Sequence, residues 1–381
     1  MQNYDAIVVG GGPSGSTCAS SLVQGGAKVL LLDGATFPRE KLCAGWLGPP
    51  IWDILELSPR EYPRNLWPWN KGRVHFGGRS YTVDIQGYFI RRYEFDEFLL
   101  RRCKATVIEG HLVRKIERQA DGNWCIDDQY QAKFLIGAGG SHCPVSRSLF
   151  PKRAHAQCGT QEKEFEADPQ EIAAYRAGED GEPEILLHDN LKGYSWNVPK
   201  TGWMNIGTGT KNAKEVLPAW EAARAFFEQS GGKGTIPPSA RTKLDKMKGH
   251  GYCGYAPEHL VAGPQPNVFI VGDSLGLAHP TTGEGICPAI LSGKLCGKAI
   301  AAGAPQDYME QLRLHPMIQD YQVLYSGRRL LEKLLGNYPS ERFQKSALLS
   351  KLVVDTFSYL FADKPLPQSR VLRRLAVHAK E

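Results

Sequence analysis

The sequence lacks the features that mark several common classes of protein. No stretch approaches the roughly 18 apolar residues that a membrane-spanning helix needs. The N-terminus runs directly into an apolar segment, with no basic region and no cleavage site of small residues, so secretion is not expected. The formal net charge of +6 is spread along the chain, which is not the pattern of a nucleic-acid-binding protein. A peripheral contact with a membrane surface stays open.

The nine cysteines include no Cys-x-x-Cys pair, and their number is odd. This pattern argues against a disulfide framework and against a zinc site. We therefore predict a reducing, cytoplasmic location and no metal site. The sequence also has no fixed-period repeat and no signal for its oligomeric state. Its 381 residues, of which 42% are hydrophobic, suffice for two or three structural units.

Short apolar runs separated by glycine turns predict an α/β fold. Residues 4–33 have the pattern strand, glycine turn, helix, strand, and residues 134–136 and 268–271 are further buried strands. Residues 94–103 are expected to be helical and 105–117 to be a strand. Antiparallel strands are predicted within 72–90, at 185–188 and at 203–206, and helices at 216–229, at 289–302 and over most of 306–365.

A glycine motif lies between the first strand and the first helix. Gly10, Gly12 and Gly15 have the G-x-G-x-x-G spacing, which allows a tight turn, a close approach to a pyrophosphate and close helix packing. Pro13 and Ser14 begin the helix, whose free N–H groups and dipole favour an anion. Asp33 ends the second strand, where a carboxylate accepts hydrogen bonds from ribose hydroxyls. These residues predict a dinucleotide but do not distinguish NAD from FAD. Such a turn also occurs without a ligand, an alternative that Asp33 disfavours.

The distant segment 272–286 narrows the choice of cofactor. It resembles the GD-x-x-G-x-x-x-P-x-x-G-x-G segment of the flavoproteins that include para-hydroxybenzoate hydroxylase, and more closely that of the geranylgeranyl reductases. The resemblance implies that FAD is the cofactor, that Asp273 binds its ribityl chain, and that Gly283, Gly285 and Ile286 lie against the pyrimidine edge of the flavin. We also expect the N-terminus of the next helix to stabilise the negative charge of reduced flavin.

Further matches extend to about residue 300. Arg92 and Asp96 lie in a segment similar to the R-x-x-F-D element, which implies a cofactor contact for Arg92 and a bracing role for Asp96. Val113 matches the strand position whose backbone contacts adenine. Residues 137–140 resemble the family's G-A-D-G, with Gly139 in place of the aspartate, which implies the loss of one local hydrogen bond.

Residues 38–46 resemble the P-R-x-K-x-C-G-G-G segment that lies beside the flavin ring in the reductases. The resemblance implies that Cys43, Ala44 and Gly45 contact the cofactor. Ala44 and Trp46 replace two glycines, and their bulk is expected to narrow or reshape the pocket. Cys43 is a candidate proton donor, with an inert buried cysteine as an equal alternative.

Three further side chains are catalytic or substrate-binding candidates. Tyr194 and Trp196 lie in a segment that resembles the reductases' G-Y-G-W-x-F-P-K and is similar to the W-x-W-x-I-P of flavin halogenases, with Tyr194 in place of the first tryptophan. They suit a bulky hydrophobic or aromatic substrate, and packing in the core is the alternative. His279 is a candidate for proton transfer, with a structural histidine as the alternative.

These observations predict a Rossmann-like FAD-binding domain with an inserted antiparallel β-sheet substrate domain and a helical C-terminal region. The predicted FAD-binding domain comprises residues 1–71, 91–154 and 255–305, the substrate domain 72–90 and 155–254, and the helical region 306–381. The helical region has one apolar face that either packs on the body or touches lipid, made by Leu349, Leu352, Val353, Phe357, Leu360 and Phe361.

Three functions remain open. The first is a reductase, in which reduced flavin delivers hydride to a carbon–carbon double bond. The second is a monooxygenase that uses O2 to hydroxylate an aromatic group, including a protein tryptophan during maturation of quinone-cofactor enzymes; the same fold hosts both chemistries. The third is a non-catalytic flavin-binding partner protein that makes its contact through basic residues near Arg370, Arg373 and Arg374. The sequence has no second dinucleotide motif, so either NAD(P)H binds transiently or a protein supplies the electrons.

Overall fold

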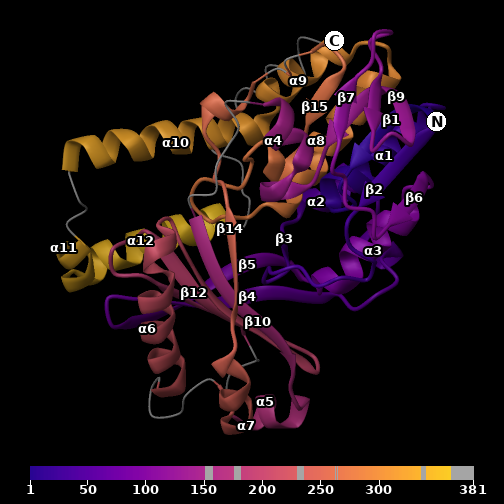
Figure 1. The fold of residues 1–381 in the computed structure, drawn as a ribbon. Coiled ribbons are helices and arrows are strands. Elements are labelled where there is room, and N and C mark those ends of the chain that lie inside the picture. The colour runs from indigo at the N-terminus through magenta and orange to yellow at the C-terminus, as the bar shows by residue number, and fades with distance from the viewer. Residues whose placement is uncertain are drawn as a thin grey trace.

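The computed structural model contains two β-sheets, one above the other in Figure 1, with helices around both. It describes residues 1–150, 158–175, 182–229, 236–261, 263, 265–335 and 340–361. The chain passes between the two sheets several times, so each sheet is assembled from segments that are distant in sequence.

The first sheet has a parallel core. Its strand order is β6-β2-β1-β9-β8-β7, and β15 also pairs with β9. Helices cover the parallel strands, which explains why these strands are continuous apolar runs. The hairpin β7–β8 adds an antiparallel edge. The strands are β1 (Gln2–Val9), β2 (Val29–Asp33), β6 (Thr106–Glu109), β7 (Ile116–Arg118), β8 (Trp124–Ile126), β9 (Tyr130–Gly137) and β15 (Val268–Ile270).

Two helices pack closely against each other at one edge of this sheet. Helix α1 (Pro13–Gln24) packs along α8 (Ile286–Ala301). A Cβ atom on Gly293 of α8 would lie 2.1 Å from the Ser14 carbonyl oxygen, so only glycine allows the helices to approach this closely. Helix α3 (Arg92–Arg102) packs on α1 as well. Because β1 leads into α1 and β15 leads into α8, both helices begin at the same edge of the sheet.

The second sheet is mainly antiparallel, with the strand order β14-β10-β13-β12-β11-β4-β5-β3. Helix α6 (Val216–Gln229) covers one face through a core that includes Phe227. The opposite face points toward the first sheet. The strands are β3 (Trp46–Leu47), β4 (Trp67–Phe76), β5 (Arg79–Phe89), β10 (Cys158–Glu166), β11 (Glu184–Leu187), β12 (Gly193–Lys200), β13 (Trp203–Thr210) and β14 (Lys248–Tyr252).

The C-terminal part is helical, as predicted, and its last described helix packs on the second sheet (Figure 1). Phe357 and Phe361 of α12 are buried against β4 and β5, so this face packs on the body. The assignment of Leu352 to the buried face is wrong, because its side chain is 58% exposed. The helices of this part are α9 (Tyr308–Leu314), α10 (Pro316–Leu335), α11 (Ser340–Lys345) and α12 (Ala347–Phe361).

The remaining described helices are short. None of the helices in the described part of the chain has the length and apolar character to cross a membrane. The short α-helices are α2 (Pro50–Leu55), α4 (Pro144–Leu149), α5 (Pro169–Tyr175) and α7 (Pro238–Arg241).

The predicted fold class is confirmed, with corrections to individual elements. The strand predicted over 105–117 is wrong, because β6 ends at Glu109 and Gly110 turns the chain with a φ of +73°. The turn is fixed by hydrogen bonds from Gly110 N–H to Ala35 and from His111 N–H to Asp33. The predicted helix 289–302 begins earlier, at Ile286. The domain boundaries stay a prediction.

Candidate active site

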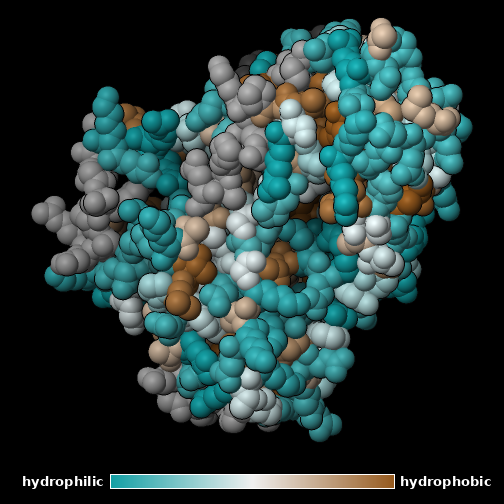
Figure 2. Space-filling view, viewed as in Figure 1, coloured by the Kyte–Doolittle hydropathy of each residue, from teal (hydrophilic) through white to brown (hydrophobic). Residues whose placement is uncertain are grey.

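A cavity of about 760 Å³ lies between the two sheets. In the space-filling view, the outer surface is mostly hydrophilic and apolar residues show in the hollowed middle of the face (Figure 2). One end of the cavity is formed by the dinucleotide loop and the other by side chains of the second sheet and of α10. The volume lies within the range of roughly 300–1,000 Å³ that is typical of ligand and cofactor sites.

The glycine motif forms a close-packed turn at the first end of the cavity. Gly10 has a φ of +115°, and a Cβ atom there would lie 2.4 Å from the Ala138 carbonyl oxygen. A Cβ atom on Gly15 would lie 1.8 Å from the Gly10 carbonyl oxygen, so both positions require glycine. Gly12 is the N-cap of α1 and has no side-chain capping bond, which leaves the N-terminal N–H groups directed at the cavity.

Asp33 is fixed at the edge of the cavity by backbone contacts. Its carboxylate accepts hydrogen bonds from Gly11 N–H at 2.6 Å and Ala35 N–H at 2.8 Å. Pro13 and Ser14 also line the cavity. Val113 is buried in the core of the first sheet and is not among the residues that line the cavity. Its predicted contact with adenine, like the predicted contact of Asp33 with ribose, stays a prediction.

Three cationic side chains face this end of the cavity: Arg39, Lys41 and Arg92. The buried Arg92 guanidinium donates two hydrogen bonds to Asp96, at 2.6 and 2.8 Å, and Arg39 lies 3.4 Å from the same carboxylate. Asp96 therefore braces two arginines rather than only its own helix. Arg39 also lies next to Gly12, since its Nη2 atom would be 3.5 Å from a Cβ atom there. Both residues lie in the segment 38–46 that is expected beside the flavin ring, but no role is predicted for either side chain from the sequence.

Lys41 is held by a residue from the other sheet. Its Nζ atom lies 2.9 Å from Nε2 of His250, on the edge strand β14. Burial lowers the pKa of Lys41, and burial together with the positive charge of Lys41 lowers the pKa of His250 to about 4. At neutral pH the His250 imidazole is therefore neutral and can accept a hydrogen bond from Lys41. No local sequence signal marks His250, because the contact joins positions that are distant in the chain.

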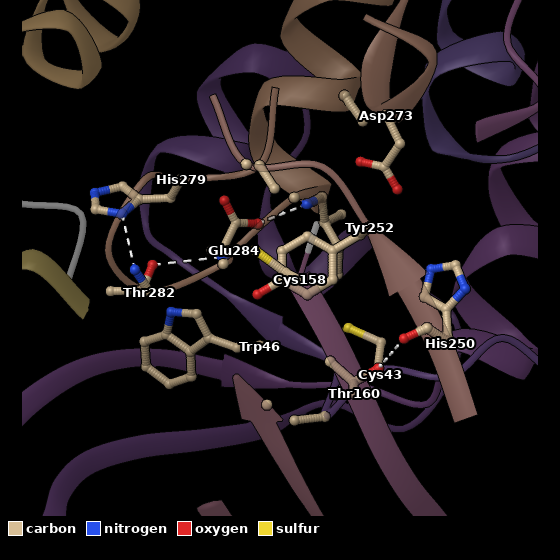
Figure 3. A pocket seen from close by; sticks show the side chains of 18 of the residues that line it. Cys43, Trp46, Cys158, Thr160, His250, Tyr252, Asp273, His279, Thr282 and Glu284 are labelled. Carbon is tan, nitrogen blue, oxygen red and sulfur yellow. Dashed lines mark hydrogen bonds between the residues drawn. The ribbon is translucent and has the colours of Figure 1, made fainter. Parts of the chain in front are cut away.

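The second predicted flavin segment converges on the glycine motif. A Cβ atom on Gly272 would lie 2.7 Å from Oγ of Ser14, and Ser274 donates a hydrogen bond to the Gly140 carbonyl oxygen at 3.1 Å. Asp273 lines the same cavity as Gly12 (Figure 3 labels Asp273 above Tyr252). The structure therefore brings the two segments together, as the sequence predicts.

The loop between Asp273 and α8 is held by two of its own side chains (Figure 3). Nδ1 of His279 accepts hydrogen bonds from the N–H groups of Thr281 and Thr282, each at 3.1 Å. Burial lowers the pKa of His279 to about 3, so its ring is neutral at physiological pH. This geometry gives His279 a structural contact in the loop, and its predicted catalytic role stays a prediction.

Glu284 caps the N-terminus of α8. Its carboxylate accepts hydrogen bonds from Ile286 N–H at 2.7 Å and Cys287 N–H at 2.9 Å. A carboxylate of the same loop thus caps the helix. The expected stabilisation of reduced flavin by this helix end stays a prediction. Gly283, Gly285 and Ile286 do line the cavity.

The segment around Cys43 forms a narrow part of the wall. Gly45 has a φ of +80°, and a Cβ atom there would lie 2.0 Å from the Ile90 carbonyl oxygen. Ala44 and Trp46 line the cavity. The Trp46 ring packs against Phe89 and Phe361, at centroid distances of 5.1 and 5.0 Å, and fills the space above Gly87. The extra bulk predicted at this position therefore lies in the wall of the cavity.

Gly139 replaces the aspartate of the family's G-A-D-G segment, and this replacement has a steric cause. A Cβ atom on Gly139 would lie 2.9 Å from the Cα atom of Cys143, closer than real Cβ contacts allow. The chain after β9 thus folds too tightly for an aspartate at this position. Sequence reasoning recorded the missing hydrogen bond but not the reason for it.

Alternation along β12 directs aromatic side chains into the cavity. Tyr194, Trp196 and Val198 line it, whereas Ser195 is completely buried and bonds to His188 on the other side. The Tyr194 hydroxyl donates a hydrogen bond to the Thr282 carbonyl oxygen at 2.6 Å. This bond joins the second sheet to the segment 272–286. The rings of Tyr194 and Trp196 lie 5.9 Å apart.

The same alternation places an unpredicted carboxyl group in the wall. Cys158, Thr160 and Glu162 of β10 all line the cavity. Glu162 is 2% exposed, and burial raises its pKa to about 7. At the far end, burial and the nearby Arg328 lower the pKa of Lys211 to about 7. Sequence analysis missed Glu162 and Lys211 because neither β10 nor the end of β13 carries a motif.

Comparisons with known proteins agree with the predicted resemblance. No protein-family model matches the chain. A digeranylgeranylglycerophospholipid reductase of Methanosphaera stadtmanae is 26% identical over 344 residues, which cover 85% of this chain and 81% of the relative. Similar solved structures include a geranylgeranyl bacteriochlorophyll reductase-like protein of Thermoplasma acidophilum, with a TM-score of 0.64, 21% identity and coverage of 99% of this chain and 96% of the other.

A flavin-dependent brominase has a similar structure as well, with a TM-score of 0.66, 16% identity and coverage of 100% of this chain and 99% of the other. At these identities the solved structures establish the fold alone. Together with the sequence relatives, they confirm the predicted resemblance to geranylgeranyl reductases within the FAD-dependent oxidoreductases.

Proposed function

We propose that the chain is an FAD-dependent oxidoreductase that reduces a carbon–carbon double bond in a bulky hydrophobic or aromatic substrate. The observation that carries this proposal is a single cavity that joins the dinucleotide loop to the aromatic wall of the second sheet. Sequence relatives named as geranylgeranyl and digeranylgeranyl lipid reductases support the reaction type.

The residues present fit FAD. Glycines at positions 10 and 15 keep the loop compact, and Gly12 leaves the start of α1 open toward the cavity. Arg39 and Lys41 also line the cavity, where they would contact the pyrophosphate. Gly10, Gly12, Pro13, Ser14 and Asp33 would hold the adenosine and phosphate part, and Asp273 with Gly283, Gly285 and Ile286 would hold the flavin part. Bound FAD supplies hydride to the substrate.

The chain's own residues shape the substrate part of the cavity. Trp46, Tyr194 and Trp196 present apolar faces that exclude water and hold a flat or branched hydrophobic group. Cys43 lies between this wall and the flavin segment, and Asn205 donates a hydrogen bond to its carbonyl oxygen at 3.2 Å. Burial raises the pKa of the Cys43 thiol, which therefore stays protonated at neutral pH.

The proposal also includes the electron donor and the cellular location of the protein. Because the sequence has no second dinucleotide motif, NAD(P)H would bind transiently or a protein would supply the electrons. The substrate class is hydrophobic or aromatic, and a cytoplasmic location follows from the reducing environment that the cysteines suggest. A peripheral membrane contact stays a prediction.

The test uses the purified holoenzyme under anaerobic conditions. The flavin is reduced with dithionite, and geranylgeranyl diphosphate is added as the probe substrate. We expect oxidised flavin to reappear together with a product that has gained two hydrogens per double bond, detected by mass spectrometry. A protein that binds no FAD, or whose reduced flavin is oxidised by none of a panel of prenyl and aromatic alkenes, would contradict the proposal.

Trp46 favours one alternative, the hydroxylation of an aromatic group by a flavin monooxygenase. Its ring replaces a glycine of the reductase pattern and adds an aromatic face to the cavity wall, which suits an aromatic ring. A protein tryptophan is one such group. This alternative predicts O2 consumption tied to incorporation of one labelled oxygen atom into the substrate, and no turnover without air.

The non-catalytic alternative rests on Arg370, Arg373 and Arg374, which lie outside the described residues. It predicts FAD binding without turnover in either the anaerobic or the aerobic assay. The two assays therefore separate all three functions.

A further inference from the structure

Glu162 is a buried carboxyl group that the proposed function does not yet use. It lies on β10, and the alternation of that strand directs it into the cavity together with Cys158 and Thr160. On the adjacent strand β13 the register partner of Glu162 is Gly207, whose partner on β12 is Trp196. A Cβ atom on Gly207 would lie 2.6 Å from the Glu162 Cβ atom and 2.5 Å from the Trp196 ring. Glycine at this position therefore allows the carboxyl group and the indole to lie side by side in the wall.

Glu162 also contacts the segment that lies nearest the predicted flavin. Its Oε1 atom accepts a hydrogen bond from Cys43 N–H. The Cys43 carbonyl oxygen accepts one from Asn205, whose own Oδ1 atom accepts a hydrogen bond from Trp196 at 2.7 Å. The Cys43 peptide is thus fixed to the second sheet on both sides. Asn205 also forms a hydrogen bond with the Glu162 side chain, so the carboxyl group has a defined position beside Cys43.

Burial favours the protonated form of Glu162, whereas the charge of Lys200 lowers its pKa and that of Glu164 raises it. Lys200 is the nearest cation from β12, but its ammonium is completely buried and already pairs with Glu164 at 2.7 Å. Among the ion pairs of the described residues, none includes Glu162. His250 on β14 and Lys41 in the loop before β3 form a hydrogen bond with each other. Burial without a counter-ion of its own raises the pKa of Glu162 to about 7, so the group gains and loses a proton near neutral pH.

The two side chains that the sequence suggested as acids are less suited to this step. His279 uses Nδ1 to hold two backbone N–H groups and stays neutral. The Cys43 thiol has a raised pKa, so loss of its proton would leave a costly buried thiolate. A carboxyl group whose pKa lies near the working pH is the better general acid.

We propose that Glu162 is the acid that donates a proton to the substrate carbon when the double bond is reduced. The inference rests on the proposed reductase function. The π bond of the substrate breaks, one carbon receives hydride with two electrons from reduced flavin, and the adjacent carbon receives the proton of Glu162. Two C–H bonds form, and Glu162 is left as a carboxylate that water in the cavity reprotonates.

The experiment compares E162Q, E162D and E166Q holoenzymes with the wild type. Glutamine keeps an acceptor for Cys43 N–H but has no acidic proton, whereas aspartate keeps the acid. Glu166 lies on the same strand with an exposed side chain and is the matched control. In each variant the flavin is reduced anaerobically and mixed with geranylgeranyl diphosphate.

We expect E162Q to slow flavin reoxidation by about 100-fold or more, a typical loss for a general acid, with unchanged FAD affinity and KM. E162D should recover part of the rate and keep a limb in the pH profile, which E162Q loses, and E166Q should match the wild type. A Glu162 that only positions Cys43 would be replaced equally well by glutamine. An E162Q rate equal to that of the wild type would overturn the proposal.

Infrared difference spectra of the substrate-free holoenzyme between pH 5 and pH 9 separate this proposal from the proposed function. A protonated-carboxyl band that titrates near neutral pH in wild type and E166Q, and is absent from E162Q, supports the acid. Identical spectra in all three overturn it. If the band is present but wild-type reduced flavin is oxidised by no alkene, the reductase function fails and the acid role in alkene reduction fails with it.

Discussion

At the scale of single residues, buried polar side chains in this molecule mainly hold backbone in place. His279 accepts two N–H groups of its own loop, and Glu284 accepts the first two of α8. Each contact satisfies donors that would otherwise be buried and unpaired, at a cost of about 1–3 kcal/mol per group. These two residues therefore hold the shape of the loop that is expected to face the flavin.

His279 should make stability depend on pH. Its pKa is about 3 in the folded chain and about 6.5 when unfolded, so between these values the unfolded chain binds more protons. The stabilisation is complete above pH 6.5 and falls as pH decreases, by up to about 1.4 kcal/mol per pH unit. In urea unfolding between pH 7 and pH 5, H279Q should lose less stability than the wild type. Equal slopes for the two proteins would show that His279 does not titrate in this way.

Glu284 should tune the bound flavin. Its carboxylate lies in the cavity wall at the start of α8, where a negative charge opposes electron uptake. E284Q should raise the two-electron midpoint potential by about 20 mV, equivalent to about 1 kcal/mol. Spectroelectrochemical titration measures the shift, with E258Q, at the α10 end of the cavity, as the control. A lower potential in E284Q would mean that its role as the helix cap outweighs its charge.

At the scale of elements, the close contact of α1 with α8 positions both flavin segments. A Cβ atom on Gly293 would meet the backbone of Ser14, which cannot move without opening the dinucleotide turn. G293A should therefore cost about 1–3 kcal/mol of unfolding free energy and weaken FAD binding. Gly327 on α10 has no atom within 4 Å of its Cβ position, so G327A should leave stability unchanged or increase it by about 0.5–1 kcal/mol. Denaturant titration and flavin fluorescence measure the two effects.

Elements with a local signal were predictable from the sequence. The first β-α-β unit follows from contiguous apolar runs around Gly10, and the contact of Asp273 with the same cavity follows from the resemblance of its segment. Glu162 and His250 could not be found in this way. Their strands carry no motif, and only the register of β10 with β13 and β14 brings them to the wall beside Cys43.

The predictions that failed have the same cause. The strand expected over 105–117 is interrupted because Gly110 and His111 bond to the chain after β2, a contact that local propensity does not contain. Leu352 is predicted to lie on the buried face of α12, but its side chain is exposed, and the neighbouring Val353 and Val354 pack on the second sheet instead. Tertiary contacts decide both cases.

At the scale of the whole molecule, the cavity is lined by residues of both sheets. The first sheet contributes the dinucleotide loop, the second contributes aromatic side chains, and α12 closes the wall with Phe361 against Trp46. A ligand that touches both sheets adds contacts that neither sheet can make alone. FAD should therefore stabilise the whole fold rather than one domain.

A substitution at Gly12 should affect cofactor binding without affecting folding. A Cβ atom at this position makes only ordinary contact, 3.5 Å from Arg39, and its backbone φ of −69° suits any residue, so G12A should fold with the same apoprotein melting temperature as the wild type. The added methyl group would point into the cavity where the pyrophosphate is expected, and should weaken FAD binding at least about tenfold, or about 1.4 kcal/mol. At FAD concentrations of about 100 Kd, the wild type should gain about 2.7 kcal/mol of stability, and G12A should gain correspondingly less. Thermal unfolding with and without FAD measures both quantities. An equal FAD-induced increase in the two proteins would mean that the cofactor does not approach α1 at Gly12, and that the glycine motif is only a packing feature of the turn.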